Sequence, residues 1–292
     1  MLKSQFQTIV ALCFLAFSCQ QKPDNTPKDS IESFSYGSRN DSALAYFNRG
    51  WLQIMDNGQW TLAENSFRKA VEIDPDFLIG QSLVGRITRD LDERKEILNL
   101  IEQSQQSLDT DEKLLLDVYV SSLGLLNARD QKQKISPDRI SAHYSLSEKN
   151  FRKFVHRHPK ESYIKAEYVE VLHANYDADQ AIDSLEDLTS SDQKNLPFFI
   201  GYKATMLAET GRFNPALSSA KKLEDFVNDP AMPAPYVVFA AVYSSMDSLA
   251  QAKKYIDKAV VLDPNHLIAL GLKKELEGKI ISAQDLEDNK TN

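Results

Sequence analysis

Five oxygen-bearing side chains between residues 175 and 186 have the spacing of a calcium-binding loop. They are Asn175, Asp177, Asp179, Asp183 and Glu186. Calcium prefers oxygen ligands, and alternating carboxylates followed by a final glutamate suit a loop wrapped around the ion. However, Gln180 stands where such a loop needs a glycine, and Ala181, Leu185 and Leu188 continue a helical spacing through the same residues. We therefore predict a capped helix here, with calcium binding by these five residues as the alternative.

No other arrangement of residues indicates catalysis or metal binding. The sequence contains no nucleophile elbow, no His-Glu-x-x-His, no glycine-rich phosphate loop and no dinucleotide-binding fingerprint. His156 and His158 form the only close histidine pair, and a spacing of two places their rings on different faces of a helix. We therefore predict that the protein is not an enzyme and needs no cofactor and no metal.

The first nineteen residues combine a positive charge, an apolar run and a cysteine. Lys3 supplies the charge, Ile9–Phe17 is an uninterrupted apolar run, and Ser18 precedes Cys19. With these residues the segment resembles a bacterial lipoprotein signal peptide. The run is too short for a membrane-spanning helix, which needs about 20 apolar residues. The resemblance implies that residues 1–18 are removed and that Cys19 carries the lipid. An ordinary cleaved secretory signal is the alternative.

The two cysteines of the chain both belong to this N-terminal region. Cys13 leaves with the signal and Cys19 is used for lipid, so the folded part has no thiol for a disulfide, a zinc site or a nucleophile. Residues 19–40 are rich in Gln, Asn, Asp, Pro and Ser, which predicts a flexible tether. The lipoprotein resemblance implies a place in the bacterial cell envelope, on the outer membrane by analogy with Gln20 after the cysteine.

The elements of the folded part are predicted from a helical motif that recurs along the chain. The motif Ala63-x-x-x-Phe67-x-x-Ala70-x-x-x-x-Pro75 returns 189 residues later as Ala252-x-x-x-Ile256-x-x-Ala259-x-x-x-x-Pro264. Intermediate copies place a small or apolar residue at the same helix crossing, at Ala63, Ile97, Ser147, Ala181, Ala216 and Ala252. Successive crossings are 34, 50, 34, 35 and 36 residues apart, close to the period of a helix-turn-helix repeat. We predict an all-α fold, an α-solenoid of six antiparallel helix pairs closed by a thirteenth helix from about His266 to Glu277.

With these residues the chain resembles the tetratricopeptide repeat family. The last copy fits best, with Tyr236, Phe239 and Tyr243 in unbroken register with Ala252, whereas the first copy needs one extra residue before Gly58. The resemblance covers residues 41–278 and leaves a polar tail at 279–292. It implies a superhelix that binds protein or peptide partners.

The step of 50 predicts an enlarged third repeat over about residues 105–159. Leu116, Tyr119, Leu123 and Leu126 have the spacing of one long helix, and a second long helix is expected to end near His158. A simple long hairpin and a dedicated binding extension are both compatible with this pattern.

The family resemblance also selects candidate partner-binding residues, because the first helix of each repeat lines a concave groove. The register places six side chains there, namely Phe47, Trp51, Thr205, Glu209, Val237 and Ser244. Their mixed character, aromatic at one end, suggests contact with a protein or peptide through apolar anchors. For Trp51, packing against a neighbouring segment is the alternative.

The charge of the chain argues against nucleic acid as a partner. The formal net charge is −8, and no basic stripe with interleaved aromatic residues occurs. We therefore predict a non-enzymatic scaffold or adaptor for protein–protein interaction, lipid-anchored in the cell envelope. The alternative is a ligand-binding lipoprotein that captures a glycan or nutrient for an outer-membrane transporter.

Overall fold

All regular structure in residues 34–104 and 109–291 is helical in the computed structural model of the chain, whose side chains are described as far as residue 282. The helices are α1 (Asp41–Trp51), α2 (Trp60–Ile73), α3 (Leu78–Ile87), α4 (Leu91–Ser104), α5 (Thr110–Asp130), α6 (Pro137–Arg157), α7 (Ser162–Asn175), α8 (Ala178–Leu188), α9 (Pro197–Glu209), α10 (Phe213–Val227), α11 (Ala234–Ser245), α12 (Leu249–Leu262) and α13 (Leu267–Thr291). A π-helical turn, η1 (Leu52–Asp56), continues α1, and a 3-10 turn, η3 (Gln193–Asn195), precedes α9. The predicted all-α solenoid of thirteen helices is confirmed over these residues, while the predicted signal peptide and Cys19 lie outside them.

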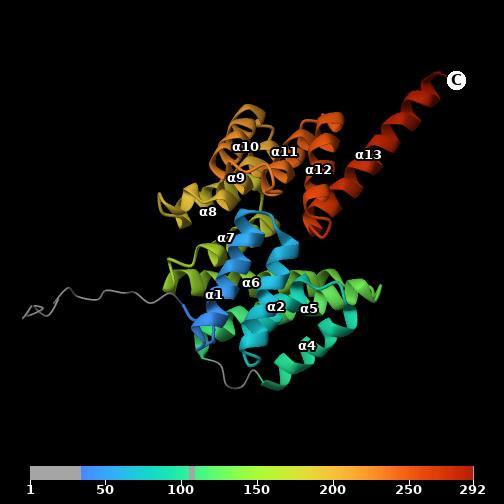
Figure 1. The fold of residues 1–292 in the computed structure, drawn as a ribbon. Helices are drawn as coiled ribbons and strands as arrows, with labels where there is room; N and C mark the ends of the chain where they lie inside the picture. The colour runs from blue at the N-terminus through green and yellow to red at the C-terminus, as the bar shows by residue number, and fades with distance from the viewer. Residues whose placement is uncertain (1–33, 105–108, 292) are drawn as a thin grey trace, which may run out of the picture. The chain divides into compact units, whose positions relative to one another are not determined.

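Consecutive helices pack as six pairs that stack on one another (Figure 1). First helices of neighbouring pairs also contact each other where α3 meets α5 and where α9 meets α11. All six residues that the sequence places at the helix crossings are buried, namely Ala63, Ile97, Ser147, Ala181, Ala216 and Ala252. A small residue at a crossing lets two helix backbones approach closely, which is why the motif predicts the packing so well.

The third pair is a long hairpin. Helices α5 and α6 have 21 residues each. Asp109 begins α5 with a capping box to Glu112, and Ser136 caps α6 with Pro137 as its first residue. The buried residues of α5 lie between Leu115 and Ala128, and those of α6 lie between Ser147 and Val155.

The two ends of the folded part differ from the prediction. Residues 34–40 were expected to belong to a flexible tether, but Tyr36 is buried and the Phe34 ring packs on Phe154 with 4.9 Å between centroids. The Phe34 N–H also donates to Glu161 Oε1 at 3.1 Å. Two aromatic side chains are enough to hold this polar segment against the folded part, because burying each ring contributes a few kcal/mol.

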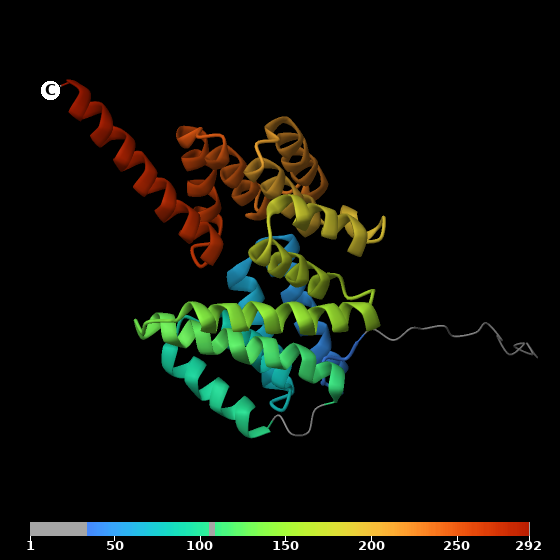
Figure 2. The ribbon, with the colours of Figure 1, turned by 180° about the vertical axis from the view of Figure 1, so that it is seen from behind.

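At the other end, α13 continues to Thr291 in place of the predicted polar tail. In both views its second half runs away from the other helices (Figures 1 and 2). Among the side chains of α13 that the structure describes, Leu276 is the last to be buried, so residues 277–282 form a helix without a core to cover. None of the described helices combines the length and the apolar character needed to cross a membrane.

The π-helical turn η1 absorbs the extra residue of the first repeat. The Asn57 N–H donates to Leu52 O five residues earlier, which is the spacing of a π-helix. The turn displaces Asp56 into the protein, where its carboxylate accepts hydrogen bonds from the Tyr163 hydroxyl at 2.8 Å and the Phe198 N–H at 3.1 Å. Phe198 is the second residue of α9, so Asp56 caps a helix that follows it by 142 residues.

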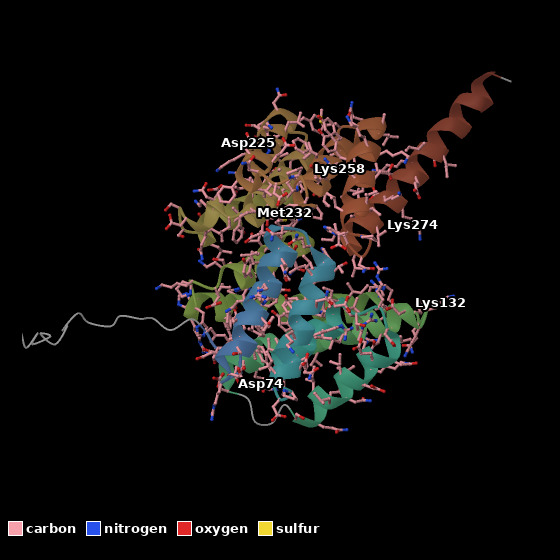
Figure 3. The ribbon with its side chains drawn as sticks, viewed as in Figure 1. Asp74, Lys132, Asp225, Met232, Lys258 and Lys274 are labelled. Carbon is pink, nitrogen blue, oxygen red and sulfur yellow. The ribbon has the colours of Figure 1, made fainter. Side chains whose placement is uncertain are left out.

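A second long-range helix cap joins the last repeat to the first. Asp263 accepts from the Thr61 N–H at 2.9 Å and from the Thr61 hydroxyl at 2.6 Å, at the first turn of α2. The Ala234 N–H donates to Asn57 O at 3.1 Å. We call these contacts, between residues 57–61 and residues 234 and 263–266, the junction. It lies at the start of α2, and Asp74, labelled in Figure 3, marks the opposite end of that helix.

Candidate functional site

Helices α1, α2, α3, α7, α9, α10 and α11, together with η1 and the start of α13, surround a cavity of about 350 Å³. This volume lies at the lower end of the range found for small-molecule sites. Most of the lining is apolar, with contributions from Ile54, Met55, Leu83, Val237, Val238, Ala241, Ile268 and Leu272. Ile268 is 56% exposed, so the cavity reaches the surface beside the first turn of α13.

Aromatic rings form much of the wall. The Trp51 indole stacks on the Tyr163 ring, with 5.9 Å between centroids and 13° between planes. Phe198 and Tyr202 stack one turn apart on α9 at 5.5 Å. The Trp51 Nε1–H is buried and finds no hydrogen-bond partner among the described residues. An unpaired buried donor is uncommon in native proteins. The wall of the cavity therefore contains one hydrogen-bond donor, the Trp51 Nε1–H, that has no acceptor among the described residues.

An ion pair between a half-buried arginine and a buried glutamate lies at the polar end of the cavity. Arg86 of α3 pairs with Glu167 of α7 at 2.6 Å between Nη1 and Oε1. The Tyr119 hydroxyl donates to the other carboxylate oxygen of Glu167 at 2.6 Å, and the Arg86 guanidinium lies 4.7 Å from the centre of the Tyr119 ring. Both carboxylate oxygens of Glu167 therefore have a partner, and Glu167 neutralises the positive charge of Arg86.

Glu170, one turn after Glu167 on α7, is a second carboxyl at this end. It lines both the main cavity and a neighbouring hollow of about 190 Å³. It forms no hydrogen bond or ion pair with any residue that the structure describes. Burial, and next the negative charge of Glu167, raise the pKa of the Glu170 carboxyl to about 7, against the opposing effect of Arg86. The cavity therefore contains one carboxyl more than it has cations to balance.

His266 connects the cavity wall to the junction. Its ring packs on Trp60 at 5.4 Å, and its Nδ1 accepts the Ala269 N–H at 3.3 Å, so the side chain caps α13. Burial lowers the pKa of His266 to about 4, although Asp263 nearby favours the charged form. The imidazole is therefore neutral at neutral pH.

Replacing His266 with asparagine is expected to remove an acid-sensitive element of the fold. The pKa of His266 is lower in the folded chain than in the unfolded chain, so the unfolded state takes up the proton first and stability falls as the pH drops from about 6.5 through 4. Between pH 7 and pH 5 the loss from this group amounts to about 2 kcal/mol. Asparagine retains a capping acceptor without titrating.

The measurement is the melting temperature of wild type and variant at both pH values. The His266→Asn variant should lose less stability on acidification than wild type does. Any loss of packing in the variant lowers its stability equally at both pH values and does not change this difference. The exposed His156→Asn variant serves as the control and should follow wild type. An unchanged pH dependence in His266→Asn would refute the assignment.

The structure brings three of the six predicted partner-binding residues together. Trp51, Thr205 and Val237 all line the cavity, from α1, α9 and α11. Phe47 does not join them: it is 0% exposed and packs between the rings of Phe67 and Phe77, so its expected place on an open groove is wrong. The reason is the ordered segment at residues 34–40, whose Tyr36 ring covers Phe47 at 4.9 Å.

Glu209 and Ser244 lie outside the cavity lining. The Glu209 side chain is 58% exposed and contacts His173 Nε2 at 3.0 Å. Ser244 accepts a hydrogen bond from Lys279 of α13 at 3.3 Å. Whether any of the six residues contacts a partner stays a prediction.

The alternative of a calcium loop at residues 175–186 is not supported. Helix α8 runs through these residues, with Asp177 as its N-cap accepting from the Gln180 N–H at 2.8 Å. Glu186 pairs with Lys194 at 2.8 Å and Lys203 at 2.6 Å, and Asp179 pairs with Arg212. Asn175 donates to Glu148, and Asp183 lies on the exposed side of α8. A helix holds these side chains on different faces, so they cannot surround one ion.

Nowhere in residues 34–104 and 109–282 do three or more His, Cys, Asp or Glu side chains gather in a way that suits a metal.

The charged residues of the cavity, Arg86, Glu167 and Glu170, were not found from the sequence. Arg86 lies on α3 and the two carboxyls lie on α7, the first helices of the second and fourth pairs, and none of the three belongs to the recurring helix-crossing motif. One signal did point to the site: the extra residue before Gly58, because the π-helical turn that accommodates it supplies Ile54 and Met55 to the lining. Single π-helical turns are often found at functional sites.

Comparison with known proteins gives one match to a family. A tetratricopeptide repeat model matches residues 43–77 and 234–266, which are the two segments that meet at the junction. The chain matches no curated protein.

Several solved structures are similar at low identity. A chain of the APC/C hetero-tetramer Cut9-Hcn1 is 14% identical, with 81% of this chain and 43% of that chain covered and a TM-score of 0.42. YrrB, described as a TPR protein with an unusual peptide-binding site, is 17% identical, with coverages of 71% and 97% and a TM-score of 0.35. The TPR2AB domain of yeast Sti1 in complex with pHSP90 is 15% identical, with coverages of 81% and 99% and a TM-score of 0.29. The present chain thus spans less than half the length of the first of these.

Proposed function

We propose that this chain, which belongs to the tetratricopeptide repeat family, is a non-enzymatic scaffold that binds another protein while a lipid on Cys19 holds it in the bacterial cell envelope. Folds of this family are typical of protein–protein interaction scaffolds. The observation that carries the proposal is the convergence of Thr205, Val237 and Trp51 on one hollow that reaches the surface. These residues come from the first helices of three different repeats, which is the arrangement that lets a stack of repeats hold a partner.

The mechanism we envisage is positioning. A lipid anchor confines the scaffold to a surface, which raises the effective concentration of any partner held there. The support for the anchor is the apolar run Ile9–Phe17 followed by Ser18 and Cys19. The outer membrane is the proposed location.

The geometry supports a protein partner better than a glycan. Sugar recognition needs several hydrogen-bonding groups that converge on hydroxyls, whereas the lining here is mainly aliphatic and aromatic. Capture of a glycan or nutrient for an outer-membrane transporter therefore remains the second candidate and is not favoured by the site.

Site-specific photo-crosslinking in living cells tests the scaffold. A crosslinking amino acid at Thr205 or at Val237 is expected to capture the same protein, because both side chains face one hollow. Lys254, on the exposed face of α12, provides the control position and should not capture that protein. Equal capture from the control, or none from either inner position, would contradict the proposal.

The anchor is tested in the same cells with the Cys19→Ala variant. The chain is expected to move from the membrane fraction to the soluble fraction, and the crosslink from Val237 to weaken as the local concentration falls. A Cys13→Ala variant controls for the loss of a thiol as such. If Cys19→Ala stays with the membrane, lipid attachment at this residue is wrong.

A further inference from the structure

We propose that the cavity binds a small organic cation, an ammonium group carried on an apolar or aromatic body, with the charge placed against Glu170. This site goes beyond the scaffold function and does not depend on it. No partner protein is needed for the cavity to be filled.

The charges around the cavity select a cation. Arg86 and Glu167 neutralise each other at 2.6 Å, and Tyr119 occupies the second oxygen of Glu167. Glu170 has no such partner among the described residues, and it faces the hollow. A carboxyl in a poorly solvated position is strongly stabilised by an incoming cation, whereas an anion there would meet two carboxyls and only one guanidinium.

The walls favour a cation with an apolar body. The rings of Trp51, Phe198 and Tyr202 line the hollow, and aromatic faces attract organic ammonium ions. The remainder of the lining is aliphatic and would cover the rest of the molecule. A volume of about 350 Å³ suits a compact ligand.

Inside the cavity the junction favours a small molecule over an extended peptide, so a partner protein would reach the hollow only through the opening beside Ile268. The Ala234 N–H to Asn57 O bond joins the first repeat to the last at the edge of the cavity, where Gly58 and Ala234 are themselves part of the lining. A peptide running along the first helices would need this passage to be open. A small cation needs only the opening beside Ile268.

Binding is expected to strengthen as the pH rises through the pKa of Glu170, which is about 7. The cation prefers the ionised carboxylate, so affinity should be about tenfold higher at pH 8 than at pH 6. The other groups that line the two hollows beside Glu170 are Arg86, Tyr119, His143, Tyr144, Glu167, Tyr202 and His266. Burial raises the pKa of Tyr119 and Tyr202 and lowers the pKa of His143 and His266, which favours the neutral form of all four, while Arg86 stays charged.

Calorimetric titration of the purified full chain tests the proposal with a matched pair of probes. Tryptamine carries an indole and an ammonium group, and tryptophol is its neutral hydroxyl counterpart. Tryptamine is expected to bind wild type at millimolar concentration or below, at least tenfold more tightly than tryptophol. The Glu170→Gln variant should lose that preference, and exposed Glu102→Gln on α4 should keep it.

The folded state of Glu170→Gln is checked by its melting temperature at pH 8. Replacing this partly buried carboxyl with an amide should leave the melting temperature unchanged or raise it, so lost binding would not reflect unfolding. Three results would overturn the proposal: equal binding of tryptamine and tryptophol, unchanged tryptamine binding in Glu170→Gln, or no binding of tryptamine to wild type. Each of them leaves the crosslinking test of the scaffold unaffected.

Discussion

Replacing Arg86 with methionine is expected to destabilise the folded protein by about 3 kcal/mol, because it leaves a buried carboxylate without its counterion. Glu167 is only 6% exposed in its side chain, and Arg86 is the cation paired with it at 2.6 Å. Methionine preserves the length and the apolar stem of the arginine, so the change removes mainly the charge. A loss of this size should lower the melting temperature by roughly 6 to 12 °C.

The neighbours of the pair add to the expected loss. Tyr119 still donates to Glu167, but one neutral hydroxyl does not replace a guanidinium. The ionisation of Glu170 also depends on Arg86, because the positive charge of Arg86 opposes the upward shift of the Glu170 pKa. Without it, two carboxyls on successive turns of α7 would face each other in a poorly solvated space.

Two further variants separate charge from packing. The double variant Arg86→Met with Glu167→Gln should recover most of the stability, because the amide carries no charge and still accepts from Tyr119. Arg129→Met is the control: this arginine pairs with Asp130 but its side chain is 63% exposed, so a change within about 0.5 kcal/mol is expected. If the double variant is as unstable as Arg86→Met alone, the buried charge is not the cause.

The repeat geometry could be predicted from the sequence because it depends on local spacing. A small residue at Ala63, Ala181, Ala216 or Ala252 must lie where two helices cross, whatever the rest of the chain does. The long α5 and α6 hairpin follows in the same way from an uninterrupted helical pattern. These features need no knowledge of which distant residues meet.

The segment at residues 34–40 shows where local reasoning stops. Its composition is that of a tether, yet Phe34 and Tyr36 find an apolar surface on α1 and α6. The composition describes the average polarity of the segment, whereas its burial depends on the rings of Phe34 and Tyr36 alone. The same error placed Phe47 on an open groove, since the groove wall at that point is covered by Tyr36.

The cavity could not be predicted because it is made by contacts between residues that are far apart in the chain. Small rotations from one repeat to the next accumulate, and their sum decides whether the first repeat meets the last. Asp263 reaches Thr61 across 202 residues, and Asp56 reaches Phe198 across 142. The sequence gives the period of the repeat but not the rotation, so Arg86, Glu167 and Glu170 could not be assigned to one site.

Gly58 offers the sharpest test of the junction, because replacing it with alanine should disrupt a contact that only glycine allows. Its φ is +71°, and an added Cβ would lie 2.8 Å from the Ala234 nitrogen and 3.0 Å from the Ala234 Cα. Both are backbone atoms, which cannot rotate away as a side chain would. The clash and the strain of a positive φ together should cost about 3 kcal/mol.

Gly211 is the matched control in the fifth repeat. It has nearly the same backbone conformation, with a φ of +77°, but no atom lies within 4 Å of its added Cβ. Gly211→Ala should therefore cost only the strain, about 1 kcal/mol. Asp247 shows that this turn accepts a side chain, since it holds the corresponding position in the last repeat with a φ of 55°.

Hydrogen exchange locates the difference between the two variants. The Ala234 amide donates to Asn57 O, so Gly58→Ala should speed its exchange while Gly211→Ala should not. The fluorescence of Trp60, which packs on His266, should change in the first variant only. Equal losses of stability in the two variants, with the Ala234 amide unprotected already in wild type, would mean that the first and last repeats do not hold each other in solution, because the clash can arise only where the two backbones touch.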